Sequence, residues 1–158
     1  MLPIGFTVYG QPATQGSKKV VPILKGGQPV MKGGRPLTRA VNADPKLGQW
    51  RQQVAEVAQR EYPGEPYLGP VGLRLIFTRP RPKAHFGSGR NADKIKPSAP
   101  PWPISRPDTL KLARAIEDAL TGVVWKDDSQ VVCHTLTKVY GERHEVFIFV
   151  KPMLEDPT

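Results

Sequence analysis

Apolar residues alternate with polar ones in several short stretches of the chain, which is the pattern of half-buried β-strands. Residues 4–10 and 71–78 follow this pattern, with Phe6 and Val8 on one face of the first strand. A third stretch, residues 145–151, is apolar on both faces and is predicted to be a central strand. Shorter strands are predicted for residues 20–24, 123–125 and 131–139.

Two other stretches repeat apolar residues every three or four positions, which predicts amphipathic helices. The first helix is predicted to open at Asp44-Pro45, where Asp accepts bonds from free N–H groups, and to run to about Glu61. The second is predicted to start at Pro107 and to end near Thr121. Its buried stripe is predicted to consist of Leu112, Ala113, Ile116, Ala119 and Leu120.

This order of strands and helices predicts an α+β fold with a mixed β-sheet packed by two main helices. We expect a single small domain over residues 1–158 and detect no internal repeat. Glycine and proline predict a loop or hairpin excursion at residues 25–43. Residues 79–106 are predicted to form a long basic loop, and residues 152–158 a frayed tail.

The charge of the chain is concentrated in two of these loop-like segments. The net charge is +9, and residues 15–46 carry seven Lys and Arg against one Asp, as do residues 79–106. Clustered positive charge on loops suits a phosphate backbone, because each neutralised phosphate releases counterions. Phe86 and Trp102 in the second segment suit either base stacking or packing of a lid. The alternative is that the basic loop is a mobile lid without a ligand.

Several other kinds of site do not fit the sequence. The only cysteine, Cys133, excludes an intramolecular disulfide and reads as a packed thiol. The N-terminus lacks the features of a signal peptide, and no apolar run approaches the roughly 20 residues that span a bilayer, so we expect an intracellular protein without a membrane partner. The basic turn at residues 15–19 lacks P-loop spacing, and we expect no nucleotide cofactor.

Carboxylates gather in one stretch of this basic chain. Asp108 stands at the start of the second helix, and Asp127 and Asp128 stand side by side in the turn after residue 125. If the helix start and the turn converge, they form an oxygen-rich site for Mg²⁺ or Mn²⁺, which can activate water for phosphodiester hydrolysis. The alternative is ordinary helix and turn design. Asp118, about 15 Å further along the helix, is expected to fix the helix by hydrogen bonding.

The same stretch resembles a known family. RPDTLKLARAIEDALTG at residues 106–122 and VVWKDDSQVV at 123–132 resemble the RusA family of Holliday-junction resolvases, common in phages and prophages. FTVYGQPATQGSKK at 6–19 resembles the family's N-terminal strand and basic turn. FTRPRPKAHFGSGRNADKIKPSAP at 77–100 resembles the loop of its phage branch. The likeness covers most of the chain except roughly residues 20–43.

The resemblance implies a fold and an activity. Family members are small mixed α/β proteins that act as homodimers and cut four-way DNA junctions with Mg²⁺ or Mn²⁺. Carried over residue by residue, it implies metal ligands at Asp108, Asp127 and Asp128, which would also be catalytic. Arg114 falls where the family has an essential lysine, so the charge is kept but the residue type is not.

One position departs from the family pattern. The second aspartate of the helix start falls at Leu110, which cannot bind a metal. Three interpretations follow. In the first, the remaining aspartates suffice and water fills the other metal positions. In the second, another acid compensates; Glu117 is on nearly the same face but about 10 Å further along the helix, which makes direct replacement unfavourable. In the third, the protein binds junctions without cutting them well. An apolar residue at position 110 also suits a dimer or partner contact.

Two functions are therefore predicted. The first is a Mg²⁺-dependent endodeoxyribonuclease that resolves four-way junctions in the cytoplasm of a bacterial host, encoded by a phage or prophage. The alternative is a catalytically weakened or inactive protein that binds branched DNA on the same fold. Both place the same residues at DNA: Lys18, Lys19, Arg79, Arg81, Lys83, His85, Arg90, Lys94, Lys96, Arg106 and Lys111.

Overall fold

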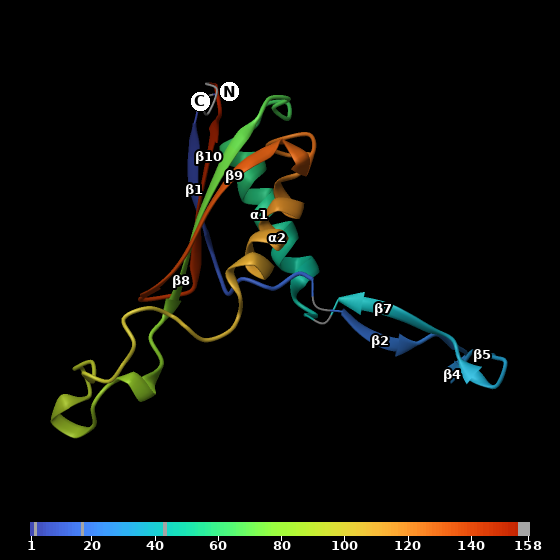
Figure 1. The fold of residues 1–158 in the computed structure, drawn as a ribbon, viewed down its shortest axis with the longest axis horizontal. Coiled ribbons are helices and arrows are strands. Elements are labelled where there is room, and N and C mark those ends of the chain that lie inside the picture. The colour runs from blue at the N-terminus through green and yellow to red at the C-terminus, as the bar shows by residue number, and fades with distance from the viewer. Residues whose placement is uncertain (2, 17, 43, 155–158) are drawn as a thin grey trace.

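A four-stranded sheet forms the body of the molecule, with two helices on one of its faces (Figure 1). The computed structural model describes residues 1, 3–16, 18–42 and 44–154. The sheet order is β1-β10-β8-β9, in which β10 pairs antiparallel with β1 and β8, and β9 runs parallel to β8. These strands are β1 (Ile4–Tyr9), β8 (Val71–Pro80), β9 (Val131–Gly141) and β10 (Glu145–Pro152). The predicted mixed α+β fold is confirmed.

Both helices begin later than the sequence predicts. Helix α1 spans Leu47–Glu61 and helix α2 spans Thr109–Leu120. The Asp44 carboxylate accepts hydrogen bonds from the backbone N–H of Lys46 and of Thr14, both at 3.0 Å, and thereby forms a turn before the helix. Helix α2 lies in the connection between the parallel strands β8 and β9, which carries the chain over the helical layer.

The core lies between the sheet and the two helices. The predicted stripe of α2 is buried, and Trp50 and Val54 of α1 are buried beside it. Trp125, which follows α2, is fully buried. From the sheet, the core receives Phe6, Val8, Leu73, Leu75, Phe77, Val146, Ile148 and Val150. Fully burying one such side chain stabilises the folded state by roughly 1.5–3 kcal/mol. Together these buried side chains hold α2 against the sheet.

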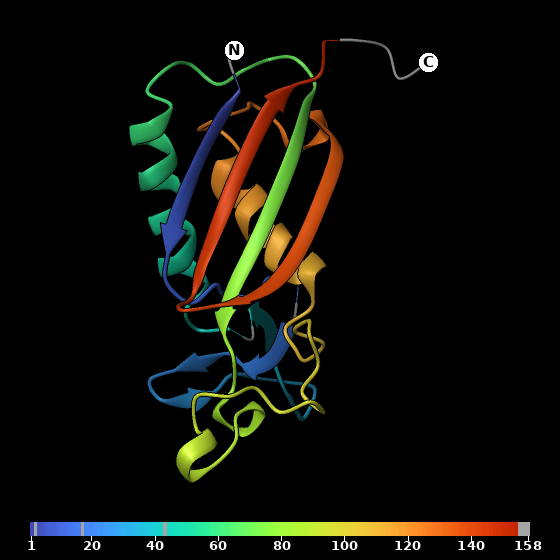
Figure 2. The ribbon, with the colours of Figure 1, turned by 90° about the vertical axis from the view of Figure 1, so that its left-hand side faces the viewer.

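The other face of the sheet carries no helix, as Figure 2 shows. Strand β10 is internal to the sheet as predicted, yet Phe147 on this face remains 38% exposed. The prediction of a packed thiol at Cys133 is wrong, because Cys133 is exposed. It lies on the edge strand β9, beside Arg74, Phe149 and Lys151 of the uncovered face. Alternation placed Cys133 correctly on a strand but did not reveal which face has a covering layer.

Residues 18–42 form an arm that projects away from the sheet and helices (Figure 1). Strands β2 (Lys18–Pro22) and β7 (Thr38–Asn42) pair antiparallel along its length. Beyond them lie two small hairpins, β3 (Leu24–Lys25) with β4 (Gln28–Pro29), and β5 (Met31–Lys32) with β6 (Arg35–Pro36). The excursion is thus β-structure throughout, and its ribbon begins earlier than the predicted residue 25.

Residues 81–106 form most of a long connection between β8 and α2, with two short 3₁₀ helices, Lys83–His85 and Gly89–Asn91, and an antiparallel bridge between Phe86 and Ile95. Carbonyl groups hold it in place: Arg81 Nη1 donates to Pro100 O at 2.9 Å, and Lys96 Nζ donates to Ala84 O at 2.9 Å. Phe86 is half-buried, whereas Trp102 is 58% exposed. Several of the loop's cations therefore have a structural role.

The segment after α2 is a turn, so the predicted strand at residues 123–125 is wrong. Gly122 N donates to Trp125 O at 2.7 Å and Val124 N donates to Leu120 O at 2.9 Å, which closes the chain on itself. A third 3₁₀ helix, Asp128–Gln130, then leads into β9. The first two residues of the predicted frayed tail are ordered: Pro152 belongs to β10, and Met153 N donates to Pro70 O. Residues 155–158 of this tail lie outside the described residues. Among the described residues, no helix is long and apolar enough to cross a bilayer.

Candidate active site

Asp108 occupies the N-cap position of α2. Its backbone is extended, and its carbonyl accepts from Leu112 N at 3.2 Å, so it precedes the first turn that the sequence predicted it to join. Its side chain makes no capping hydrogen bond and lies 3.7 Å from Lys111 Nζ. Thr14, Arg106 and Pro107 complete a polar pocket around this pair. The carboxylate is therefore exposed and has a cation beside it, next to the free N–H groups of a helix start.

A second pocket adjoins this helix start on the side of the sheet. Arg79, Arg106, Lys138 and His144 line it, with apolar walls from Phe77 and Leu112. Lys138 Nζ donates to Ser105 O and Pro107 O, both at 3.0 Å, which ties β9 to the segment preceding α2. Burial, and then the charge of Arg79, lower the pKa of His144. These neighbouring pockets concentrate positive charge next to Asp108.

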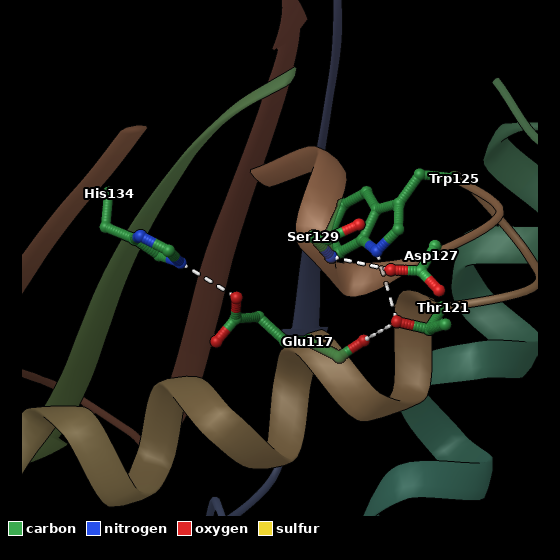
Figure 3. A network of polar contacts seen from close by, with 6 residues as sticks. All are labelled: Glu117, Thr121, Trp125, Asp127, Ser129 and His134. Atoms are coloured by element: carbon green, nitrogen blue, oxygen red, sulfur yellow. Dashed lines mark hydrogen bonds and ion pairs between the residues drawn. The ribbon is translucent and has the colours of Figure 1, made fainter. Parts of the chain in front are cut away.

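The opposite end of α2 is packed around Trp125, as Figure 3 shows. Trp125 Nε1 donates to Thr121 Oγ1 at 3.1 Å, and this hydroxyl donates to Glu117 O at 2.9 Å. Gln130 Nε2 donates to Tyr67 O at 2.8 Å and to Gly69 O at 2.9 Å. The indole ring is thus buried and its N–H has a hydrogen-bond partner. The two hydrogen bonds from Gln130 hold the turn that follows.

The paired aspartates of this turn have different surroundings. Asp127 Oδ1 accepts from Ser129 N at 2.9 Å (Figure 3). Asp127 N donates to Gln130 Oε1 at 2.8 Å. Hydrogen bonding from Ser129 lowers the pKa of Asp127 below its usual value, because it favours the charged carboxylate. Asp128 is the first residue of the 3₁₀ helix and is exposed. Asp127 therefore caps the turn, and both carboxylates are exposed.

The helix start and the aspartate pair do not converge within one chain, contrary to our expectation. Helix α2 has 12 residues, and at about 1.5 Å of rise per residue it separates Asp108 from this turn by roughly 18 Å. Among the described residues, no group of three His, Cys, Asp or Glu side chains could hold a metal ion. Asp108 and the Asp127–Asp128 pair of one chain therefore lie too far apart to share a cation.

The remaining acids of α2 already have partners. Glu117 Oε1 lies 2.8 Å from His134 Nε2 on β9, so it does not replace the carboxylate missing at Leu110. Asp118 contacts Gln15 Nε2 and lies 3.7 Å from Arg51 Nη1, which agrees with the predicted fixing of the helix. Leu110 is 74% exposed. Seven residues bring a helix back to nearly the same side, so Leu110 and Glu117 both lie toward β9.

The basic residues predicted to bind DNA divide into two groups. Arg79, Arg81 and Lys96 donate to backbone carbonyls, and Arg81 also lies over the Tyr140 ring at 4.1 Å. The His85 ring meets that of Tyr140 edge-on, with centroids 5.8 Å apart. Residues with exposed positions are Lys18, Lys19, Lys83, Arg90, Lys94, Arg106 and Lys111, and Arg114 is exposed with its guanidinium beside Gly16.

The sequence interpretation missed Lys138, His144 and Thr14. Lys138 had only a weak signal, because polar His134 already stands beside Leu136 on the same face of the strand. Thr14 and His144 had none, since both come from turns that only the folded sheet brings beside α2.

Comparison with known proteins agrees with the resemblance noted in the sequence. A model of the endodeoxyribonuclease RusA family matches residues 26–151. The uncharacterized protein YqaN of Bacillus subtilis (strain 168) is 31% identical over 149 residues, which cover 94% of this chain and 95% of the relative. The chain belongs to the RusA endodeoxyribonuclease family.

Proposed function

We propose that this chain is an endonuclease that resolves four-way DNA junctions in a bacterial cytoplasm and acts as a homodimer. The observation that carries the proposal is the exposed Asp108–Lys111 pair at the start of α2, set in a pocket with Arg106, in a member of the RusA endodeoxyribonuclease family. Cations beside a carboxylate suit a phosphodiester, because they neutralise its charge while the carboxylate remains available to a metal or to water.

A divalent cation, Mg²⁺ or Mn²⁺, supplies activated water and stabilises the leaving oxygen when it is bound. Among the described residues, one chain does not gather three carboxylates for it, since Asp108 and Asp128 stand at opposite ends of α2. We therefore place its ligands on two copies, with Asp108 of one chain and Asp127 and Asp128 of the other. Lys111 and Arg114 then neutralise the phosphate, and water completes the coordination.

The edge strand β9 is the surface on which we place the dimer contact. It pairs with β8 on one side only, and residues 132–135 are exposed. Such an edge presents unpaired backbone groups that a second copy can satisfy. Pairing two β9 strands about a twofold axis sets the two α2 helices antiparallel, because α2 lies beside β9 through the Glu117–His134 contact. Each Asp108 then faces the aspartate turn of the other chain.

Leu110 favours a second candidate function, a junction-binding protein that cuts weakly or not at all. Its exposed side chain occupies the position of a family aspartate and lies toward β9, where it suits the dimer contact. A leucine there removes one oxygen ligand and adds apolar area to the interface between copies. DNA binding by the basic loops is common to both candidates.

The deciding experiment is cleavage of a synthetic four-way junction with Mg²⁺ or Mn²⁺, beside a linear duplex of the same sequence. We expect paired nicks in the junction, none in the duplex, and none with Asp128→Asn. The control is Glu56→Gln, an exposed acid of α1 whose side chain accepts a hydrogen bond from Gln52. Tight junction binding without nicking under either metal would contradict the endonuclease and leave the second candidate.

A further inference from the structure

The arm of residues 18–42 takes no part in the candidate active site. It projects from the body of the molecule, and at its far end the β2–β7 ribbon meets the two small hairpins (Figure 1). Ile23, Val30 and Leu37 join them through a closed ring of backbone hydrogen bonds: Ile23 N to Leu37 O at 2.8 Å, Val30 N to Ile23 O at 2.8 Å, and Leu37 N to Val30 O at 2.7 Å.

The two end hairpins are copies of one seven-residue unit, a repeat that our sequence interpretation missed. ILKGGQP at residues 23–29 is followed directly by VMKGGRP at 30–36. Each unit turns on a Gly-Gly pair with φ of 60° and 79° in the first and 60° and 77° in the second. Positive φ at both central residues defines the type I′ turn, which glycine adopts at low cost. The repeat therefore builds two equal lobes side by side.

The lobes present apolar and cationic side chains to solvent. Leu24 and Met31, at equivalent positions of the repeat, are 57% and 55% exposed. Residues 18–42 contain six basic residues and no acidic one. In the part of the chain that the structure describes, none of these six side chains makes a hydrogen bond or an ion pair. The loop at 79–106 differs, since Arg79, Arg81 and Lys96 there donate to carbonyls.

We propose that the arm is a second DNA-binding element, which lies along one duplex branch of the substrate and contacts its phosphates through Lys25, Lys32 and Arg35. The inference rests on the proposed function, because it takes branched DNA as the substrate. Charge complementarity selects the occupant: a surface with cations alone suits a polyanion. A two-stranded ribbon also matches the width of a duplex groove, and exposed Leu24 and Met31 suit its sugar and base edges.

The test compares two triple variants with the same change in charge. Lys25→Gln, Lys32→Gln and Arg35→Gln remove the cations of the lobes, whereas Arg60→Gln, Arg74→Gln and Lys151→Gln remove three exposed cations of α1 and the open sheet face. Binding of each to a metal-free junction with branches of about 20 base pairs is measured at several salt concentrations. Each phosphate contact contributes a slope of about 0.9 in log K against log salt, or about eightfold in affinity at 0.1 M salt.

We expect the lobe variant to lose up to about 2.7 of the wild-type slope and the control variant to keep it. A variant that joins Pro22 to Thr38 through Asn-Gly should lose as much affinity, and it answers the objection that the point variants distort the lobes. Equal slopes for the lobe variant and the control would overturn the arm proposal, and wild-type nicking of junctions would still stand. If the lobe variant no longer forms a dimer, the arm instead makes a contact between copies of the chain. That result would overturn the proposal that the arm binds DNA.

Discussion

The two ends of α2 carry the candidate carboxylates in opposite settings. At the start of the helix, Asp108 is exposed, caps nothing with its side chain, and shares its pocket with the cations Arg106 and Lys111. At the other end, Asp127 and Asp128 follow the buried Trp125 and sit on a turn fixed by Gln130. One end is therefore exposed and has cations beside its carboxylate, while the other is an acidic turn held by packing and hydrogen bonds. Under the proposed function, the active site takes one of these ends from each of two chains.

Trp125 tests the rigidity of the acidic end. Trp125→Ala removes a fully buried side chain, and we expect the free energy of unfolding to fall by about 3–5 kcal/mol. Asp108→Ala at the open end should change it by no more than about 0.5 kcal/mol, because its contact with Lys111 is exposed. Urea denaturation of both variants measures the difference. Similar losses for the two would show that the ends are not packed as differently as we describe.

Mixing two inactive variants tests whether the ends meet across a dimer. Asp108→Asn and Asp128→Asn should each lose at least about 100-fold in nicking rate, since even residues behind metal ligands cost 10–100-fold. If one site takes Asp108 from one chain and Asp128 from the other, a mixed dimer holds one intact site. Refolding the two together should then restore about a quarter of wild-type nicking. No recovery in a mixture shown to form mixed dimers would place both carboxylates of each site in one chain.

Leu110 tests how far the open end has departed from the family pattern. Leu110→Asp restores a carboxylate two residues after Asp108, and we expect about a tenfold gain in nicking at low Mg²⁺ concentration, which corresponds to about 1.4 kcal/mol. Leu110→Asn is the control of similar size without charge. The same change removes an apolar contact, so sedimentation should show a weaker dimer. A gain equal to that of Leu110→Asn would mean that position 110 does not reach the metal.

The two ends should also differ in the pH range over which they affect stability, and we expect this effect to be smaller than those above. Burial lowers the pKa of His144, so the unfolded chain binds more protons than the folded one as the pH falls through 6.5, and stability decreases there. The pKa of Asp127 lies below 3.8, so its contribution is present above that pH and is lost only in stronger acid. Between pH 7.5 and 5.5, the melting temperature should drop more for wild type than for His144→Asn. An equal drop would remove His144 as the cause.

Patterning alone predicted much of the molecule. The sheet strands, the buried stripe of α2 and the family were all accessible, because period and motif are local properties of the sequence. Cys133 was misplaced because alternation assigns a residue to a face without showing which face has a covering layer. The two lobes of the arm were missed although their repeat is visible in the sequence, since a unit of seven residues does not resemble the longer periods of repeat proteins.

The sequence by itself was enough to predict a set of candidate carboxylates and a basic surface near them, since residue type and charge need no coordinates. Only the tertiary structure decided that these carboxylates stand apart. The straight path of α2 between parallel strands fixes Asp108 and Asp128 at its two ends, and no local signal encodes that separation. Proximity along the chain suggested one site, but a helix holds its ends at a distance set by its length.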